Sequence, residues 1–255
     1  MIEVGIYVKN MEKLNLLLSN FEDNIKKIKE VLQNSITSKK QFEVSSIYFG
    51  QEFCENLYPT KQEVLKAYNK VNGLGLTFVF ITGIIRENQF DEIKEICYEL
   101  ITKDNVRLTL NDPGLISEFS ESPINLGRLR NKQKRLNKML DILNLQKESI
   151  QHLESKSIYK TYNLKSTMFE TDMVAQGTNT NENLAIYFPY SYVTSMRDCP
   201  LCDKVCTKKC QTSWIKLGNS KLYQYGNTIF FNNKPFLNSY IDKIKRVIYQ
   251  YGIPL

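Results

Sequence analysis

The chain has 255 residues, enough for one large domain or two small ones. Apolar residues make up 42%, as in an ordinary globular protein, and no apolar run approaches the roughly 20 residues that a bilayer-spanning helix needs, so we expect no membrane partner. The net charge of +7, from 34 basic and 27 acidic residues, is a mild excess that identifies no class of partner by itself.

Strand and helix patterns alternate along the first half of the chain. The apolar stretch at the start predicts a first strand, not a signal peptide, so we expect a cytoplasmic protein. Further strands are predicted at 44–49, 76–81 and 106–110, and helices at 21–33, 61–70 and 89–101. Thr60 and Glu63 have the spacing of a capping box for the second of these helices. The segment 111–114, Asn-Asp-Pro-Gly, predicts a turn.

The second half has weaker signals. Short strands are predicted at 124–126, 168–171 and 184–188, with a charged helical stretch over roughly 132–154. Residues 221–231 have the pattern of a hairpin, and 240–249 that of a last helix.

Alternating strands and helices predict an α/β fold with a mostly parallel sheet and helices outside it. The length is that of a (β/α)8 barrel, so we expect one TIM-barrel-related domain over residues 1–255 with a Cys-rich C-terminal segment. Fewer than eight clear units are visible, which leaves an incomplete or irregular barrel open. Barrel chemistry gathers where strands end, and 50–54, 83–86 and 111–114 are such ends.

Four cysteines follow one another closely, in the pattern C-x2-C-x3-C-x3-C, at Cys199, Cys202, Cys206 and Cys210. In a reducing compartment, thiols this dense indicate a metal rather than disulfides. A zinc site typically uses two well-separated pairs, whereas iron–sulfur proteins combine a compact run with a distant ligand. We therefore favour an iron–sulfur cluster bound within residues 197–214.

A regular helix would spread this run over about 16 Å, so the segment bends or one cysteine drops out and a remote one replaces it. Two remote cysteines are available. Cys97 lies on the apolar face of a predicted helix and is expected to be a core residue. Cys54 follows a predicted strand at the barrel rim, where its thiol could reach a cluster held by another rim segment.

Five segments, in order, resemble those of the collagenase-like peptidase family U-32, and of its UbiV-like iron–sulfur proteins in particular. Residues 47–54 are similar to the V-Y-L-G-x-x-x-C segment, 111–115 to an N-D-x-G turn, and 125–128 to the L-G-R that follows it. Residues 189–199 are similar to P-Y-x-Y-x-T-x-x-R-x-C, and 206–210 to the closing pair of cysteines.

The resemblance implies a barrel-like α/β fold and a 4Fe-4S cluster on Cys54, Cys199, Cys206 and Cys210. Cys202 is extra relative to that family and is the alternative ligand. The family further implies oxygen-independent hydroxylation or a related redox modification, in a complex with a paralogous U-32 subunit. Other relatives modify RNA bases, so the expected substrate is a small molecule or an RNA.

Three polar residues at the rim, Asn111, Asp112 and Arg128, are candidates for substrate contact, although Asp112 and Arg128 could also pair with each other. RNA binding has one supporting feature, the basic stretch from Arg128 to Lys138. A second alternative is a non-enzymatic adaptor in which zinc staples the loop and Trp214 covers it. Peptidase activity is not expected, because His152 is the lone histidine and no serine or zinc protease motif is present.

Overall fold

A closed barrel of eight parallel strands forms the body of the protein. The computed structural model describes residues 1–130, 168–172, 183–196, 199–201, 206–208, 210, 212–217 and 220–252. Around the barrel the strands run in the order β1-β12-β7-β6-β5-β4-β3-β2. Their bounds are β1 Ile2–Val8, β2 Phe42–Gln51, β3 Thr77–Thr82, β4 Val106–Leu110, β5 Ile124–Leu126, β6 Met168–Asp172, β7 Leu184–Phe188 and β12 Arg246–Gln250.

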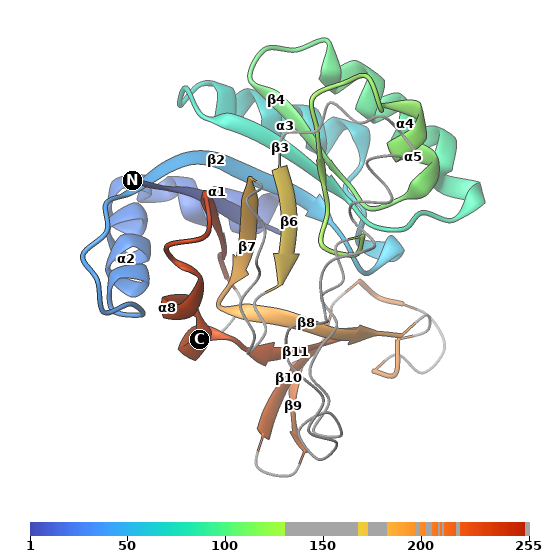
Figure 1. The fold of residues 1–255 in the computed structure, drawn as a ribbon. Coiled ribbons are helices and arrows are strands. Elements are labelled where there is room, and N and C mark those ends of the chain that lie inside the picture. The colour runs from blue at the N-terminus through green and yellow to red at the C-terminus, as the bar shows by residue number, and fades with distance from the viewer. Residues whose placement is uncertain are drawn as a thin grey trace.

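Helices pack on the outside of this barrel (Figure 1). They are α1 Met11–Ser19, α2 Phe21–Gln33, α3 Lys61–Asn72, α4 Glu87–Ile101, α5 Pro113–Glu118 and α8 Leu237–Tyr240, with 3-10 turns η1 Glu55–Leu57 and η3 Lys234–Phe236. The main apolar core lies between the helices and the outer face of the strands. Among the described residues, no helix is both long and apolar enough to cross a membrane.

A second, antiparallel sheet is inserted between β7 and β12. It consists of β8 Tyr190–Ser195, β9 Thr212–Leu217, β10 Ser220–Tyr225 and β11 Thr228–Asn232, in the order β8-β11-β10-β9. In Figure 1, β6 and β7 point toward β8, so the sheet lies at the carboxyl end of the barrel strands. Because β8 contacts both β6 and β7, this end of the barrel is the one that the sheet covers.

The barrel interior is polar and aromatic at its centre. The Glu170 carboxylate is fully buried and accepts hydrogen bonds from the hydroxyls of Tyr187 and Thr109, both at 2.7 Å. Below it, Arg246 donates to the Tyr48 hydroxyl at 3.0 Å and to Glu3, also at 3.0 Å. These contacts give the buried charges of Glu170 and Arg246 and the hydroxyls of Tyr187, Thr109 and Tyr48 hydrogen-bond partners, as burial requires.

Most strands lie where the sequence pattern predicts them, and the Thr60–Glu63 capping box is present. The barrel is closed, so the shortage of visible units does not mean a missing wall. The prediction of a last helix at 240–249 is wrong: α8 ends at Tyr240, and Arg246–Gln250 is β12, which lies between β1 and β7. Its residues are buried on both faces, which removes the strand alternation that would have identified it.

Two further corrections concern local structure. The turn predicted at 111–114 is the start of α5, because the Asp112 side chain caps that helix by accepting from the backbone of Gly114 and Leu115. The predicted hairpin is β10–β11, with Gly226 in its turn at a φ of +55°. The charged stretch at 132–154 lies outside the described residues.

Gly5 should be required by the interior of the barrel. A Cβ there would lie 2.5 Å from the Tyr48 ring, which is fully buried and hydrogen-bonded to Arg246. We expect Gly5→Ala to lower the free energy of unfolding by about 2 kcal/mol, through overpacking. Urea denaturation measures this, with Gly73→Ala, where the nearest atom would be 3.4 Å away, as the control. Equal effects of the two changes would contradict the packing argument.

Glu170 should make stability depend on pH. Burial raises the pKa of this carboxyl above its ordinary 4.5, despite its hydrogen bonds from Thr109, Tyr187 and Tyr48. The folded state therefore keeps this proton to higher pH than the unfolded state, so stability is lost as pH rises from about 4.5, the ordinary value. We expect the wild-type protein to lose stability relative to Glu170→Gln across this rise, measured by urea denaturation. A constant or growing advantage of the wild type would contradict the assignment.

Candidate functional site at the mouth of the barrel

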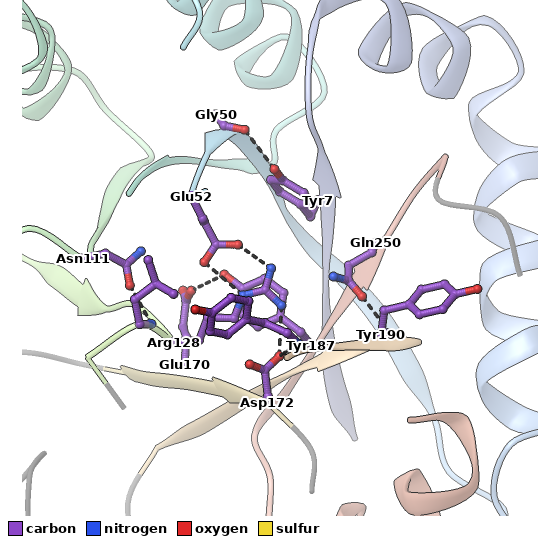
Figure 2. A network of polar contacts seen from close by, with 12 residues as sticks. Tyr7, Gly50, Glu52, Asn111, Arg128, Glu170, Asp172, Tyr187, Tyr190 and Gln250 are labelled. Atoms are coloured by element: carbon purple, nitrogen blue, oxygen red, sulfur yellow. Dashed lines mark hydrogen bonds and ion pairs between the residues drawn. The ribbon is translucent and has the colours of Figure 1, made fainter. Parts of the chain in front are cut away.

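A buried arginine lies at the centre of the barrel mouth. Arg128, just beyond β5, donates to both carboxylate oxygens of Glu52, at 3.2 and 2.6 Å, and to Asp172 at 3.0 Å (Figure 2). Arg128 and Glu52 are each about 2% exposed. Burial raises the pKa of Glu52 to about 7, against the opposing charge of Arg128. Arg128, Glu52 and Asp172 thus form an ion triad that is largely removed from water. Desolvation of these charges is costly, so the triad is not explained by packing alone.

Aromatic rings connect this triad to the second sheet. The Arg128 guanidinium lies 3.7 Å from the centre of the Tyr187 ring and 4.8 Å from that of Phe53. Phe53 is stacked on Tyr192 of β8 with ring centres 4.8 Å apart. The backbone N–H of Tyr192 donates to Asp172 at 3.1 Å. The barrel rim and the second sheet therefore share one packed junction.

Asn227, in the turn between β10 and β11, fastens the Cys54 segment to that sheet. Its side-chain amide donates to the carbonyl of Phe53 at 2.9 Å and to that of Met196 at 2.8 Å. The two bonded carbonyls lie far apart in the chain, one next to Cys54 and the other at the end of β8. Cys54 is thereby held at the edge of the sheet that carries the later cysteines.

The described cysteines of the C-terminal segment lie near Cys54. Cys54, Cys199, Cys206 and Cys210 are free and half-buried. Burial raises the pKa of Cys54, and the charges of Cys210 and Cys206 raise it further. Burial likewise raises the pKa of Cys210, with further contributions from Cys199 and Cys206. Cys54 is thus within electrostatic range of Cys206 and Cys210, and Cys210 is within range of Cys199 and Cys206.

Cys210 has the most complete surroundings. The Tyr225 hydroxyl is hydrogen-bonded to it, and its Sγ would lie 3.3 Å from a Cβ added at Gly226. The charge of Lys9 counteracts the rise in the pKa of Cys210. Within the described ranges, no three His, Cys, Asp or Glu side chains are gathered tightly enough to hold a metal ion. Cys202 lies outside the described residues.

A cavity of about 550 Å³, its solvent-open mouth included, lies between the barrel rim and the second sheet. Cys54 and Cys210 both line it. The remaining wall combines aromatic rings with a few polar side chains. The lining residues used below are Tyr7, Lys9, Phe53, Arg128, Tyr223, Tyr225, Phe230 and Gln250.

The three substrate candidates predicted at the rim all have internal partners. Asn111 is fully buried, donating to the Thr82 carbonyl at 2.6 Å and accepting from the Leu129 backbone at 2.8 Å. Asp112 caps α5 and also accepts from the backbone of Ile85. The pairing of Asp112 with Arg128, considered above, is wrong, because Arg128 pairs with Glu52 and Asp172. Of the three, Arg128 alone lines the cavity.

Other predictions have mixed outcomes. Cys97 is fully buried in the main core, as expected. Arg128 is buried and Arg130 is half-buried, while the part of that basic stretch from 131 on lies outside the described residues together with His152. Trp214 is 48% exposed and packs on Tyr223.

Sequence reasoning missed several residues of this site, among them Lys9, Glu52, Gln250 and Asn227. One feature of the sequence could have identified Glu52: it is a charged residue within 50–54, a segment predicted to lie at the end of a barrel strand. The others had none, because a lysine or an amide in a loop or strand is usually a surface residue.

Comparison with protein-family models gives no match, and no curated protein and no solved structure matches the chain either. The geometry of the mouth therefore carries the functional argument.

Arg128→Met should destabilise the protein strongly. The change leaves the carboxylates of Glu52 and Asp172 buried without a counter-charge, which typically costs about 3–5 kcal/mol. Urea denaturation gives the loss. The control is Arg86→Met, which breaks a partly exposed pair with Glu55 and should cost at most about 1 kcal/mol. Similar small losses in both variants would show that the triad does not hold the mouth together.

Proposed function

We propose that this protein is a UbiV-like member of the U-32 peptidase-like family, a TIM-barrel-related protein whose Cys-rich C-terminal segment holds a 4Fe-4S cluster against the barrel rim. The observation that carries the proposal is the approach of Cys54, which follows β2, to Cys206 and Cys210, which follow β8, with Cys199 in turn near Cys210. Residues about 150 positions apart in the sequence supply one set of thiols, as in clusters that combine a compact run with a distant ligand.

The surroundings of the thiols fit such a group. The four side chains are half-buried, and thiols are the donors that iron–sulfur clusters require. Phe53 and Tyr225 provide apolar walls, and the Tyr225 hydroxyl and Lys9 offer a hydrogen bond and a positive charge to Cys210. Hydrogen bonds to sulfur and limited exposure are the features by which proteins adjust cluster potentials.

A bound cluster would supply one-electron transfer. The chain itself would hold the four thiolates, exclude water with the Phe53–Tyr192 stack, and orient Cys54 through Glu52 and Asn227. This arrangement supports a cytoplasmic redox protein that acts in oxygen-independent hydroxylation or a related modification, with a paralogous subunit as the proposed partner. The substrate would be a small molecule rather than an RNA, because the sequestration of Arg128 weakens the basic stretch that supported RNA binding.

A zinc-stapled adaptor is the second candidate, because four thiolates also satisfy tetrahedral zinc. Trp214 does not favour it: the ring is about half exposed and carries Lys221 on one side at 4.2 Å. In a zinc site confined to the C-terminal segment, Cys202 would replace Cys54. The ligand set therefore separates the two candidates.

Cys54→Ser should remove the cluster. We expect anaerobically purified wild type to contain about four iron and four sulfide per chain, with a visible absorption band, and Cys54→Ser to lose both. Cys202→Ser should keep them, and so should Cys97→Ala, whose side chain is in the core. The measurements are iron, sulfide and zinc content and the visible spectrum of each protein.

Two results would overturn the redox proposal. One zinc per chain, unaffected by Cys54→Ser, would indicate a structural site on the C-terminal segment. Loss of iron in Cys202→Ser with retention in Cys54→Ser would mean that the barrel rim takes no part.

A further inference from the structure

The cavity at the barrel mouth contains an unsatisfied hydrogen-bond donor. Gln250 is 1% exposed and lines the cavity. Its Oε1 accepts from the backbone N–H of Tyr190 at 2.9 Å, which fixes the orientation of the amide. Nε2 has no hydrogen-bond partner. In Figure 2 this nitrogen is on the side of the amide away from Tyr190, toward the barrel mouth. A buried donor without a partner is costly, so an acceptor in the cavity would stabilise it.

A lysine lines the same cavity. The Lys9 ammonium lies 3.8 Å from the centre of the Tyr225 ring, and its backbone is held by a hydrogen bond from Gln51 to the Lys9 carbonyl at 3.0 Å. No carboxylate of the described chain lies within ion-pairing distance of this ammonium. Arg128, the other cation of the wall, is already paired with Glu52 and Asp172. Lys9, whose charge also acts on Cys210, is therefore the lining cation that has no carboxylate partner among the described residues.

The rest of the wall is aromatic and lacks carboxylates. Rings come from Tyr7, Phe53, Tyr223, Tyr225 and Phe230, and none of the lining residues is Asp or Glu. The Tyr7 hydroxyl is occupied, because it donates to the carbonyl of Gly50 at 3.0 Å. Such walls favour a flat apolar ring, and the positive charge and free amide favour an anion with oxygen acceptors.

We propose that this cavity binds a small planar aromatic carboxylate, whose ring lies among the aromatic side chains and whose oxygens meet Lys9 and Gln250. Binding needs only these side chains. A redox role for the bound molecule additionally rests on the proposed function, because Cys54 and Cys210 form part of the same wall.

The test is titration of the full chain, purified anaerobically, with naphthalene-2-carboxylate as the probe, by calorimetry and ligand fluorescence. Cyclohexanecarboxylate tests the need for a flat ring, and naphthalene-2-carboxamide tests the need for charge. We expect saturable binding of the naphthoate at one site, and at least tenfold weaker binding of both other compounds. Equal affinity for all three, or no binding of the naphthoate, would overturn the proposal.

Two variants assign the contacts. Lys9→Met removes the charge, and Gln250→Glu removes the free donor while keeping the acceptor for Tyr190. Each should weaken naphthoate binding at least tenfold. Lys221→Met is the matched control, since Lys221 also lies over a ring but does not line the cavity. Unchanged affinity in Lys9→Met, which removes a partly exposed side chain and should fold, would by itself overturn the proposal.

Iron and sulfide counts on the same samples separate this inference from the proposed function. Loss of probe binding in Gln250→Glu, which changes no residue of the proposed cluster surroundings, at full iron content supports the cavity assignment independently of the cluster. Iron-free protein that still binds the probe through Lys9 would refute the redox proposal and leave the ligand site standing.

Discussion

The arrangement of the barrel mouth depends on one buried guanidinium that forms ion pairs with two carboxylates away from water. Arg128 pairs with Glu52 at the end of β2 and with Asp172 at the end of β6, and Asp172 also accepts from the backbone of β8. Desolvation makes such a group a weak source of net stability, but removal of one member is costly. The ion triad therefore acts mainly on geometry. It fixes β2 relative to β5 and β6, which are not its neighbours in the barrel, and it fixes all three relative to β8 of the second sheet.

The position of the thiols follows from that constraint. Cys54 is two residues from Glu52, and the intervening residue, Phe53, is stacked on the second sheet and bonded through its carbonyl to Asn227. The segment is thus held from the barrel side by Glu52 and from the sheet side by Asn227. Cys199, Cys206 and Cys210 belong to the insertion between β7 and β12. Such an insertion can vary in length without disturbing the barrel.

Local signals in the sequence were sufficient for most of the barrel but not for its closure. The capping box at Thr60 and the apolar runs of the early strands act over a few residues, and the structure contains them. Arg246–Gln250 was mistaken for helix because a short apolar segment, buried on both faces, has no distinguishing period. In the second sheet, the sequence predicts the β10–β11 hairpin alone. The register of this hairpin depends on a turn glycine between adjacent strands, whereas β8 pairs with β11, which lies far from it in the sequence.

The candidate site is harder to predict from the sequence than the barrel, because the roles of its polar residues depend on partners that are remote in sequence. Glu52 and Arg128 are 76 positions apart, and neither carries a mark that distinguishes a buried ion from a surface one. Asn111 and Asp112 were correctly placed at a strand end, but the bonds that they make to the backbone, to Thr82, Leu129 and Ile85, could not be inferred without the fold. The prediction that the C-terminal cysteines bind a metal needs no remote partner, because their density alone indicates shared chemistry, and it stays a prediction.

The proposed recruitment of Cys54 bears on what the proposed metal site would do. A metal that only stapled the C-terminal loop could be satisfied within that loop, where four cysteines lie close together in the sequence. A ligand from the barrel rim would instead couple the loop to the ion triad and to the wall of the cavity that Lys9 and Gln250 line. The centre of the barrel is filled by Glu170, Tyr48 and Tyr187, so a ligand can approach the thiols from the mouth but not along the barrel axis. Of the proposed metal ligands, Cys54 and Cys210 line the cavity that Lys9 and Gln250 also line, which is where a proposed redox group would meet a substrate.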